Sequence, residues 1–100
     1  MLNKEKAINE IIEEFDFEKV KKVMELLEWT WHDVGIPSIG KLVKTAEKLL
    51  NDCFDKCLDN KADYFVGTGG FMVRAFYDKK EIYRLDLTFE ITDWSVYEPL

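Results

Sequence analysis

Apolar residues recur every three or four positions through about the first 60 residues, a period that predicts amphipathic α-helices. The first helix is predicted over residues 3–14 and the second over residues 17–29, with Asp16 as the N-cap between them. Gly35 and Pro37 predict a loop, after which Ser38 caps a third helix that extends to about Asp59. The N-terminal part of the chain is therefore expected to be helical.

The third helix has the longest apolar pattern in the chain, continuous over about five turns. Its predicted core residues are Ile39, Leu42, Val43, Ala46, Leu49, Leu50, Cys53, Cys57 and Leu58. Leu49 lies at the centre of this set, and Leu49→Ala is predicted to lower the free energy of unfolding by about 2–5 kcal/mol.

The charged residues of the same helix are arranged against the helix dipole, which favours anions near the start of a helix and cations near its end. The lysines come first and the aspartates last: Lys41, Lys44 and Lys48, then Asp52, Asp55 and Asp59. Each exposed charge in such a position costs about 0.5 kcal/mol. Either neighbouring side chains compensate for this arrangement, or it serves a partner.

From Tyr64 onward the apolar period becomes two, which predicts antiparallel β-strands. The apolar positions of the two strands are odd-numbered: Phe71, Val73, Ala75 and Tyr77, then Tyr83, Leu85, Leu87, Phe89 and Ile91. The second strand is expected to extend over residues 82–92. Because paired residues must face the core together, a three-residue loop at residues 79–81 is predicted and a two-residue loop is rejected.

In this predicted register Tyr77 lies opposite Tyr83, and the polar positions form two favourable cross-strand pairs. Arg74 is expected opposite Asp86 as an ion pair. Phe76 is expected opposite Arg84, where the guanidinium can lie on the aromatic ring.

These elements predict a single α+β domain over residues 1–100, with three N-terminal helices followed by a C-terminal antiparallel β-hairpin or small sheet. An apolar fraction of 47% fits a globular chain with one modest core. The net charge of -6 argues against direct nucleic-acid binding. No apolar run approaches the ~18 residues of a membrane span, and the amino terminus lacks an apolar targeting region. A cytoplasmic protein without membrane contacts is therefore expected.

The face of the sheet away from the long helix is the predicted partner-binding surface. Extension of the register places Val66 opposite Trp94 and Tyr64 opposite Val96 there, and an apolar cluster rimmed by charge is typical of a protein interface. The predicted partner-binding residues are Met72, Arg74, Phe76, Arg84, Asp86, Glu90 and Trp94. The alternative is that the first helix covers this face. The long strand also leaves an edge without proline, which favours strand addition or a homodimer.

The one glycine cluster of the sequence leads to a second functional hypothesis, a protein that binds or sequesters a small ligand such as a nucleotide. The residues of this alternative site are Gly67, Thr68, Gly69, Gly70, Arg74 and Arg84. Neither a following helix nor the lysine spacing of a phosphate-binding loop supports it. A bulge or a close approach of another element explains the glycines as well, and this structural interpretation is favoured.

Cys53 and Cys57 lie four residues apart on the apolar side of the third helix. Together with His32 and Asp33 they would make a four-ligand zinc set, but their spacing matches no common zinc motif. Reduced, buried and metal-free cysteines are therefore expected. No set of side chains forms a recognisable catalytic constellation, so neither enzyme activity nor a cofactor is predicted.

Several segments of the sequence together resemble small uncharacterised proteins of phages and prophages. The segments are DFEKV at 16–20, MELLEWTW at 24–31, Gly35, Pro37, Ala46, Leu49, Leu50, TGGF at 68–71 and the closing residues 89–94. The resemblance covers about residues 16–95 and implies a mobile-element origin. Small acidic phage proteins are often inhibitors of host machinery, so by analogy it implies binding to a host defence or nucleic-acid-processing protein. It carries over no catalytic residues.

Overall fold

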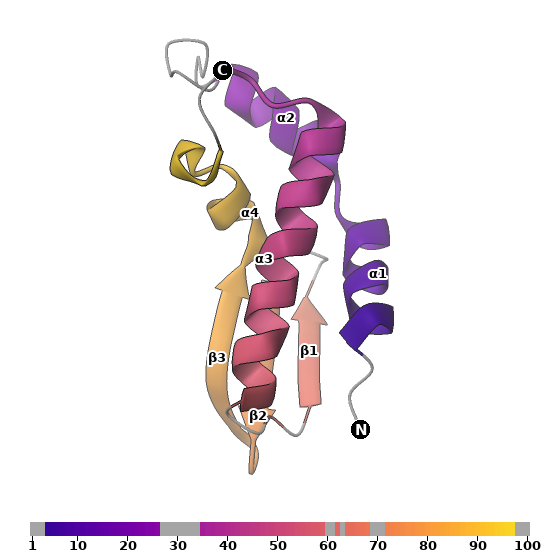
Figure 1. Cartoon of the computed structure of the whole chain (residues 1–100), viewed down its shortest axis with the longest axis vertical. Helices are drawn as coiled ribbons and strands as arrows, with labels where there is room; N and C mark the ends of the chain where they lie inside the picture. The colour runs from indigo at the N-terminus through magenta and orange to yellow at the C-terminus, as the bar shows by residue number, and fades with distance from the viewer. Residues whose placement is uncertain (1–3, 27–34, 60–61, 63, 69–71, 98–100) are drawn as a thin grey trace.

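The computed structural model describes residues 4–26, 35–59, 62, 64–68 and 72–97. Its helices are α1 (Lys4–Glu14), α2 (Phe17–Leu26), α3 (Ile39–Asp59) and α4 (Leu87–Ile91), with a short 3-10 helix, η2, at Trp94–Val96. Its strands are β1 (Tyr64–Thr68), β2 (Met72–Tyr77) and β3 (Lys80–Asp86). The fold is α+β, with the long helix α3 packed along one face of an antiparallel sheet (Figure 1).

Side-chain caps define where the predicted helices begin. The Lys19 amide donates to Asp16 Oδ1 at 3.0 Å, and the Lys41 amide donates to Ser38 Oγ at 3.2 Å. Both residues therefore satisfy amides that have no partner within their own helix. The predicted starts of α2 and α3 are confirmed, whereas the predicted end of α2 at Trp29 lies outside the described residues.

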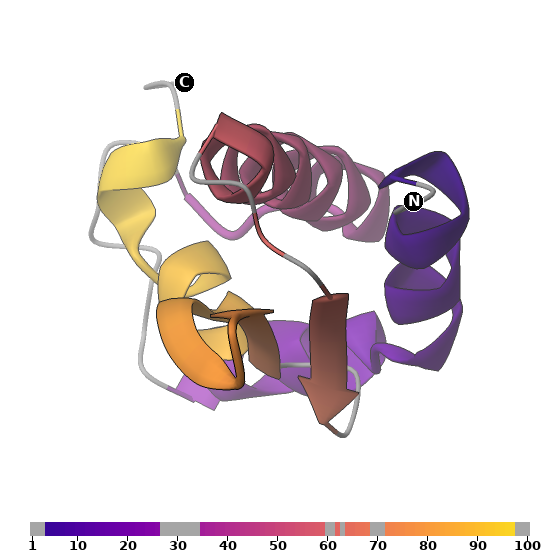
Figure 2. The ribbon, with the colours of Figure 1, turned by 90° about the horizontal axis from the view of Figure 1, so that it is seen from below.

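The three strands form one antiparallel sheet in the order β1-β2-β3. Helix α1 packs against α3 on the side nearer β1, so it does not cover the face of the sheet that points away from α3 (Figure 2). On the other side, Lys56 Nζ of α3 lies 5.9 Å from the centre of the Tyr83 ring of β3. The alternative that the first helix covers the outer sheet face is therefore wrong.

One apolar cluster joins α1, α2, α3, α4 and the sheet. Its buried members are Ile8, Ile11, Phe15, Phe17, Val20, Met24, Leu42, Ala46, Leu50, Cys53, Phe54, Val73, Ala75, Leu85, Leu87, Ile91 and Tyr97. Phe54 was absent from the predicted core but is only 1% exposed, whereas Leu49 is half-buried. The centre of the buried side of α3 is thus Leu50, because α1, α2, α4 and β3 together determine which side of the helix is covered.

The β2–β3 hairpin has a two-residue turn, so the predicted three-residue loop at 79–81 is wrong. Tyr77 pairs with Lys80, and the intervening Asp78 and Lys79 have φ angles of 50° and 64°. Two consecutive positive φ angles are typical of the type I′ turn, which matches the twist of a hairpin.

Because β3 contains a β-bulge, the two-residue turn is compatible with buried residues of β2 and β3 on the same face of the sheet. Phe76 pairs with Glu81, but its neighbour Ala75 pairs with Tyr83, which leaves Ile82 as the extra residue of β3. Val73, Ala75 and Leu85 are consequently all buried, as the parity of the sequence predicts. The rejected two-residue loop is possible because the bulge changes the parity within the strand.

The two-residue turn and the bulge together change the cross-strand pairs. Arg74 lies opposite Arg84 rather than Asp86, and Phe76 lies opposite Glu81 rather than Arg84. Asp86 lies opposite Met72.

The predicted strand over residues 82–92 is wrong beyond Asp86, where the chain turns into α4. Asp86 Oδ1 accepts a hydrogen bond of 3.1 Å from the Phe89 amide and so caps the new helix. Leu87 and Ile91 are both fully buried, as a helical spacing of four allows, but Phe89 between them is 70% exposed. A strand would have buried all three.

The first predicted strand is also divided into two, because β1 pairs with β2. Val66 lies opposite Arg74 and Tyr64 lies opposite Phe76, so the predicted pairs with Trp94 and Val96 are wrong. Within the described part of the chain, no helix has the length and apolar character that crossing a membrane requires.

Candidate functional site

The outer face of the sheet, on the side away from α3, gathers most of the predicted partner-binding residues. Five side chains of β2 and β3 lie at its positions: Met72, Arg74, Phe76, Arg84 and Asp86. They alternate with the buried Val73, Ala75 and Leu85, and none of the five is buried. We call these five residues, with Glu81, the outer face.

Glu81 holds the two arginines of the outer face together. Arg74 Nε donates to Glu81 Oε1 at 2.5 Å, and Arg84 donates through Nη2 to Oε2 at 2.8 Å and through Nε to Oε1 at 3.2 Å. Arg74 and Arg84 lie directly opposite each other, where like charges repel. The shared carboxylate offsets this repulsion.

Hydrogen bonds from Arg84 and then from Arg74 hold the pKa of Glu81 below its usual value of 4.5. The same contact with Glu81 raises the pKa of Arg84. Because the folded-state pKa of Glu81 is lowered, its contribution to stability is present above about pH 4.5 and is lost as the pH falls through the folded value. At neutral pH the Glu81 carboxylate is therefore charged.

The apolar residues of the outer face lie beside these charges. The guanidinium carbon of Arg74 lies 5.2 Å from the centre of the Phe76 ring, within the range of a cation–π contact. The sequence predicted such a contact for Phe76, but with Arg84. Glu81 is not among the predicted site residues because a loop was predicted at residues 79–81, although an acidic residue three positions before Arg84 is a usable signal.

The other two predicted partner-binding residues lie elsewhere. Glu90 is a half-buried residue of α4, and Trp94 begins η2 with 47% of its surface exposed. Neither belongs to the sheet, because the chain leaves it after Asp86.

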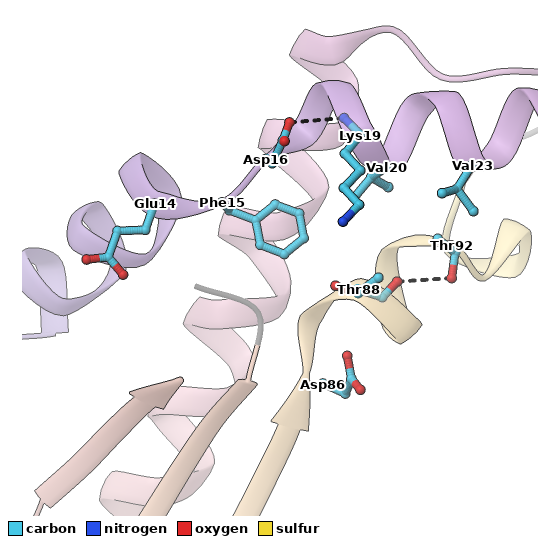
Figure 3. Close-up of a pocket in the computed structure, with 9 residues that line it drawn as sticks. All are labelled: Glu14, Phe15, Asp16, Lys19, Val20, Val23, Asp86, Thr88 and Thr92. Atoms are coloured by element: carbon cyan, nitrogen blue, oxygen red, sulfur yellow. Dashed lines mark hydrogen bonds between the residues drawn. The ribbon is translucent and has the colours of Figure 1, made fainter. Parts of the chain in front are cut away.

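A pocket of about 500 Å³ lies where Asp86 leaves the sheet, between α2 and α4 (Figure 3). Phe15, Val20 and Val23 supply its apolar lining, and the polar lining residues are Glu14, Asp16, Lys19, Asp86, Thr88 and Thr92. The Thr92 hydroxyl donates to the Thr88 carbonyl oxygen at 3.0 Å, and the Asp16 and Asp86 carboxylates cap α2 and α4. These polar groups therefore complete helix ends, and they account for the local structure without a ligand.

The residues of the alternative ligand site are only partly described. Gly67 pairs with Val73 and Thr68 with Met72 at the end of β1, whereas Gly69 and Gly70 lie outside the described residues. Arg74 and Arg84 are both bound to Glu81. A phosphate would have to compete with this carboxylate for the two cations.

The open edge of β3 is protected against simple strand addition. Among the described strands, β2 alone pairs with β3, so one side of β3 has no strand neighbour. The bulge at Ile82 and the exposed Lys80 interrupt this edge. Bulges and lysines are features by which natural sheets avoid edge-to-edge pairing.

Cys53 is only 2% exposed on the inner side of α3, which confirms its predicted burial. The Cys57 side chain, His32 and Asp33 lie outside what the structure describes. Within the described residues, no three His, Cys, Asp or Glu side chains are grouped so that they could hold a metal ion.

No protein-family model matches the chain. Comparisons with curated proteins and with solved structures likewise give no significant match. The geometry of the outer face is therefore the main support for a functional proposal.

Proposed function

We propose that this protein is a small acidic, phage-type protein that acts by binding a host protein, with the outer face as its contact surface. The observation that carries the proposal is the arrangement of Arg74, Glu81 and Arg84 beside Phe76. Arginine and aromatic side chains contribute much of the binding energy in protein interfaces.

The outer face is ordered before a partner arrives. Glu81 fixes both guanidinium groups, and Phe76 lies against one of them. Side chains that are already held lose less conformational entropy on binding than mobile ones. The arginine side chains nevertheless remain 38% and 56% exposed for Arg74 and Arg84, so they are accessible to a partner.

The negative net charge of the protein supports the proposal that its target is a protein with a basic surface. A charge of -6 attracts basic surfaces over long range, and proteins that bind nucleic acids present such surfaces. We propose a host defence or nucleic-acid-processing protein as the target and its inhibition as the consequence. The net charge accelerates the encounter, and the outer face makes the short-range contacts.

The test begins with the affinity-tagged protein expressed in a bacterial host and captured at low salt. Mass spectrometry identifies any co-purifying host protein, and native mass spectrometry reports any bound small molecule. Calorimetry with the purified partner then compares the wild type with Arg84→Glu, which is expected to raise the dissociation constant about tenfold or more. Lys22→Glu is the matched control, because Lys22 is exposed on α2 and its replacement changes the net charge equally.

Equal weakening by Arg84→Glu and Lys22→Glu would show that net charge, and not the outer face, determines binding. Capture of a nucleotide in place of a protein would overturn the proposal in favour of ligand binding. Circular dichroism of each variant establishes that the fold is retained.

A further inference from the structure

The solvent-exposed side of α3 carries a line of charges that changes sign near the middle of the helix. We call Lys41, Lys44, Lys48, Asp52 and Asp55 the charge face; all five are exposed. Their spacings of three or four residues place them along one side of the helix. The buried Leu42, Ala46 and Leu50 occupy the opposite side.

The charge face is open to solvent, since all five of its residues are exposed. In Figures 1 and 2 helix α3 lies on one side of the sheet, with α1 beside it. Helix α1 reaches the charge face through Lys4, which pairs with Asp55. A partner could therefore approach along most of the length of α3.

The charge face is not neutralised within the described part of one chain. Its one recorded ion pair joins Lys4 Nζ of α1 to Asp55 Oδ1 at 2.6 Å, and the Asp55 side chain still remains 61% exposed. The three lysines make no ion pair with any described residue. Lys44 and Lys48 repel each other at a separation of four residues, whereas Lys48 and Asp52 attract each other at the same separation.

We propose that the charge face binds the charge face of a second copy of this chain, with the two α3 helices antiparallel. Lys48 and Asp52 lie two residues on either side of position 50, while Lys44 and Asp55 lie six and five residues from it. A two-fold axis at the level of position 50 therefore places Lys48 beside Asp52 of the partner subunit. The same axis places Lys44 beside Asp55 of the partner subunit.

A second copy fits this surface better than a uniformly charged partner. Each half of the charge face complements the other half, which is the property of a surface that pairs with itself about a two-fold axis. A purely acidic partner would match the lysines but would meet the aspartates with like charge. Antiparallel pairing also brings the ends of the two helix dipoles into favourable opposition.

The dimer is weak and depends on salt. Helix α3 has 21 residues, hence a length of about 31 Å, and its exposed side offers a limited, polar contact area. Exposed charges are screened over about 8 Å at physiological ionic strength and over about 30 Å at 0.01 M. The outer face lies on the other side of the sheet from α3, so dimerisation leaves it free for the proposed host partner (Figure 2).

Sedimentation equilibrium of the full chain tests the proposal directly. The wild type is expected to dimerise at ~0.15 M salt, where the long-range repulsion between two chains of net charge -6 is screened but ion pairs in direct contact are not. Its dissociation constant should rise about tenfold or more at ~1 M salt, where the screening length falls to about 3 Å. A chain that stays monomeric at both salt concentrations would overturn the proposal without affecting the proposed host interaction.

Two charge-swapped variants identify the surface. The acidic variant carries Lys44→Glu and Lys48→Glu, and the basic variant carries Asp52→Lys and Asp55→Lys. Each is expected to be monomeric alone because its own charge face then repels itself, whereas an equimolar mixture should form a heterodimer. The substituted positions are all exposed, so both variants should retain the fold, and circular dichroism of each variant establishes this.

The matched control for the acidic variant is Lys22→Glu with Lys79→Glu, two exposed positions away from α3. This control changes the net charge equally and should still dimerise. An acidic variant that dimerises like the wild type, or a mixture that remains monomeric, would place the dimer contact elsewhere and overturn the proposal.

Discussion

At the scale of single residues, short polar side chains determine where the helical segments begin. Asp16, Ser38 and Asp86 accept hydrogen bonds from the first turns of α2, α3 and α4. Asp93 does the same for η2, and the Ser95 amide that donates to it holds the pKa of Asp93 below its usual value. Each cap acts within three residues, so its effect is local and can be read from neighbouring residues.

Tyr97 is the residue whose ionisation the fold affects most clearly. Its hydroxyl donates to the Ile91 carbonyl oxygen at 2.7 Å, and its burial raises its pKa from 10.0 to about 12. Tyr97→Phe should lower the free energy of unfolding by about 1 kcal/mol at neutral pH, because the carbonyl oxygen loses its donor.

The same hydroxyl should make the wild type lose stability in alkali. Its folded-state pKa is raised, so its contribution is complete below about pH 10 and is lost as the pH rises toward about 12. Urea unfolding at neutral and alkaline pH should therefore show a steeper decline for the wild type than for Tyr97→Phe. Tyr77→Phe, at a position that is 49% exposed, is the control. Parallel pH profiles for wild type and Tyr97→Phe would contradict this explanation.

At the scale of the elements, α3 is the helix that positions the others. Helices α1, α2 and α4 and strand β3 all contact it. Its two sides follow from one periodic sequence, since the positions that are apolar pack inward and the charged positions between them form the charge face.

The burial of α3 predicts that replacing Leu50 costs more stability than replacing Leu49. Leu50→Ala should lower the free energy of unfolding by about 2–5 kcal/mol, because Leu50 is fully buried. Leu49→Ala should cost distinctly less, since Leu49 is only half-buried. Chemical denaturation of both variants measures the difference. Equal losses would show that Leu49 is packed as tightly as Leu50.

At the scale of the whole molecule, the protein is elongated, with extents of 45 × 22 × 20 Å. The apolar cluster runs through this length and joins helices from both halves of the chain to the sheet. The charge face and the outer face lie on opposite sides of this cluster (Figure 2). The two proposed contacts therefore use separate surfaces.

The continuity of the cluster predicts cooperative unfolding. Far-ultraviolet circular dichroism reports the helices, and near-ultraviolet circular dichroism reports the packing of aromatic rings. Both signals should change together in guanidinium chloride, because neither the helices nor the sheet can keep its buried face without the other. Loss of one signal at a distinctly lower denaturant concentration would show that part of the chain unfolds independently.

Features that depend on neighbouring residues could be predicted from the sequence. The periods of 3.6 and two identify the first three helices and the buried side of β2 and β3, and Asp16 and Ser38 mark two helix starts. Arg74, Phe76 and Arg84 could be assigned to one face because the parity of a strand is a local property.

Features that depend on contacts between distant residues could not be predicted from the sequence. Leu87 and Ile91 suit a strand and a helix equally well, and the structure buries them from α4 while leaving Phe89 exposed. The register of β2 and β3 depends on one extra residue at Ile82, which carries no distinct sequence signal, and this register makes Glu81 the partner of both arginines. A strand pair is fixed by packing across the whole sheet, so a one-residue bulge changes every pair beyond it, whereas a helix is fixed by contacts within four residues.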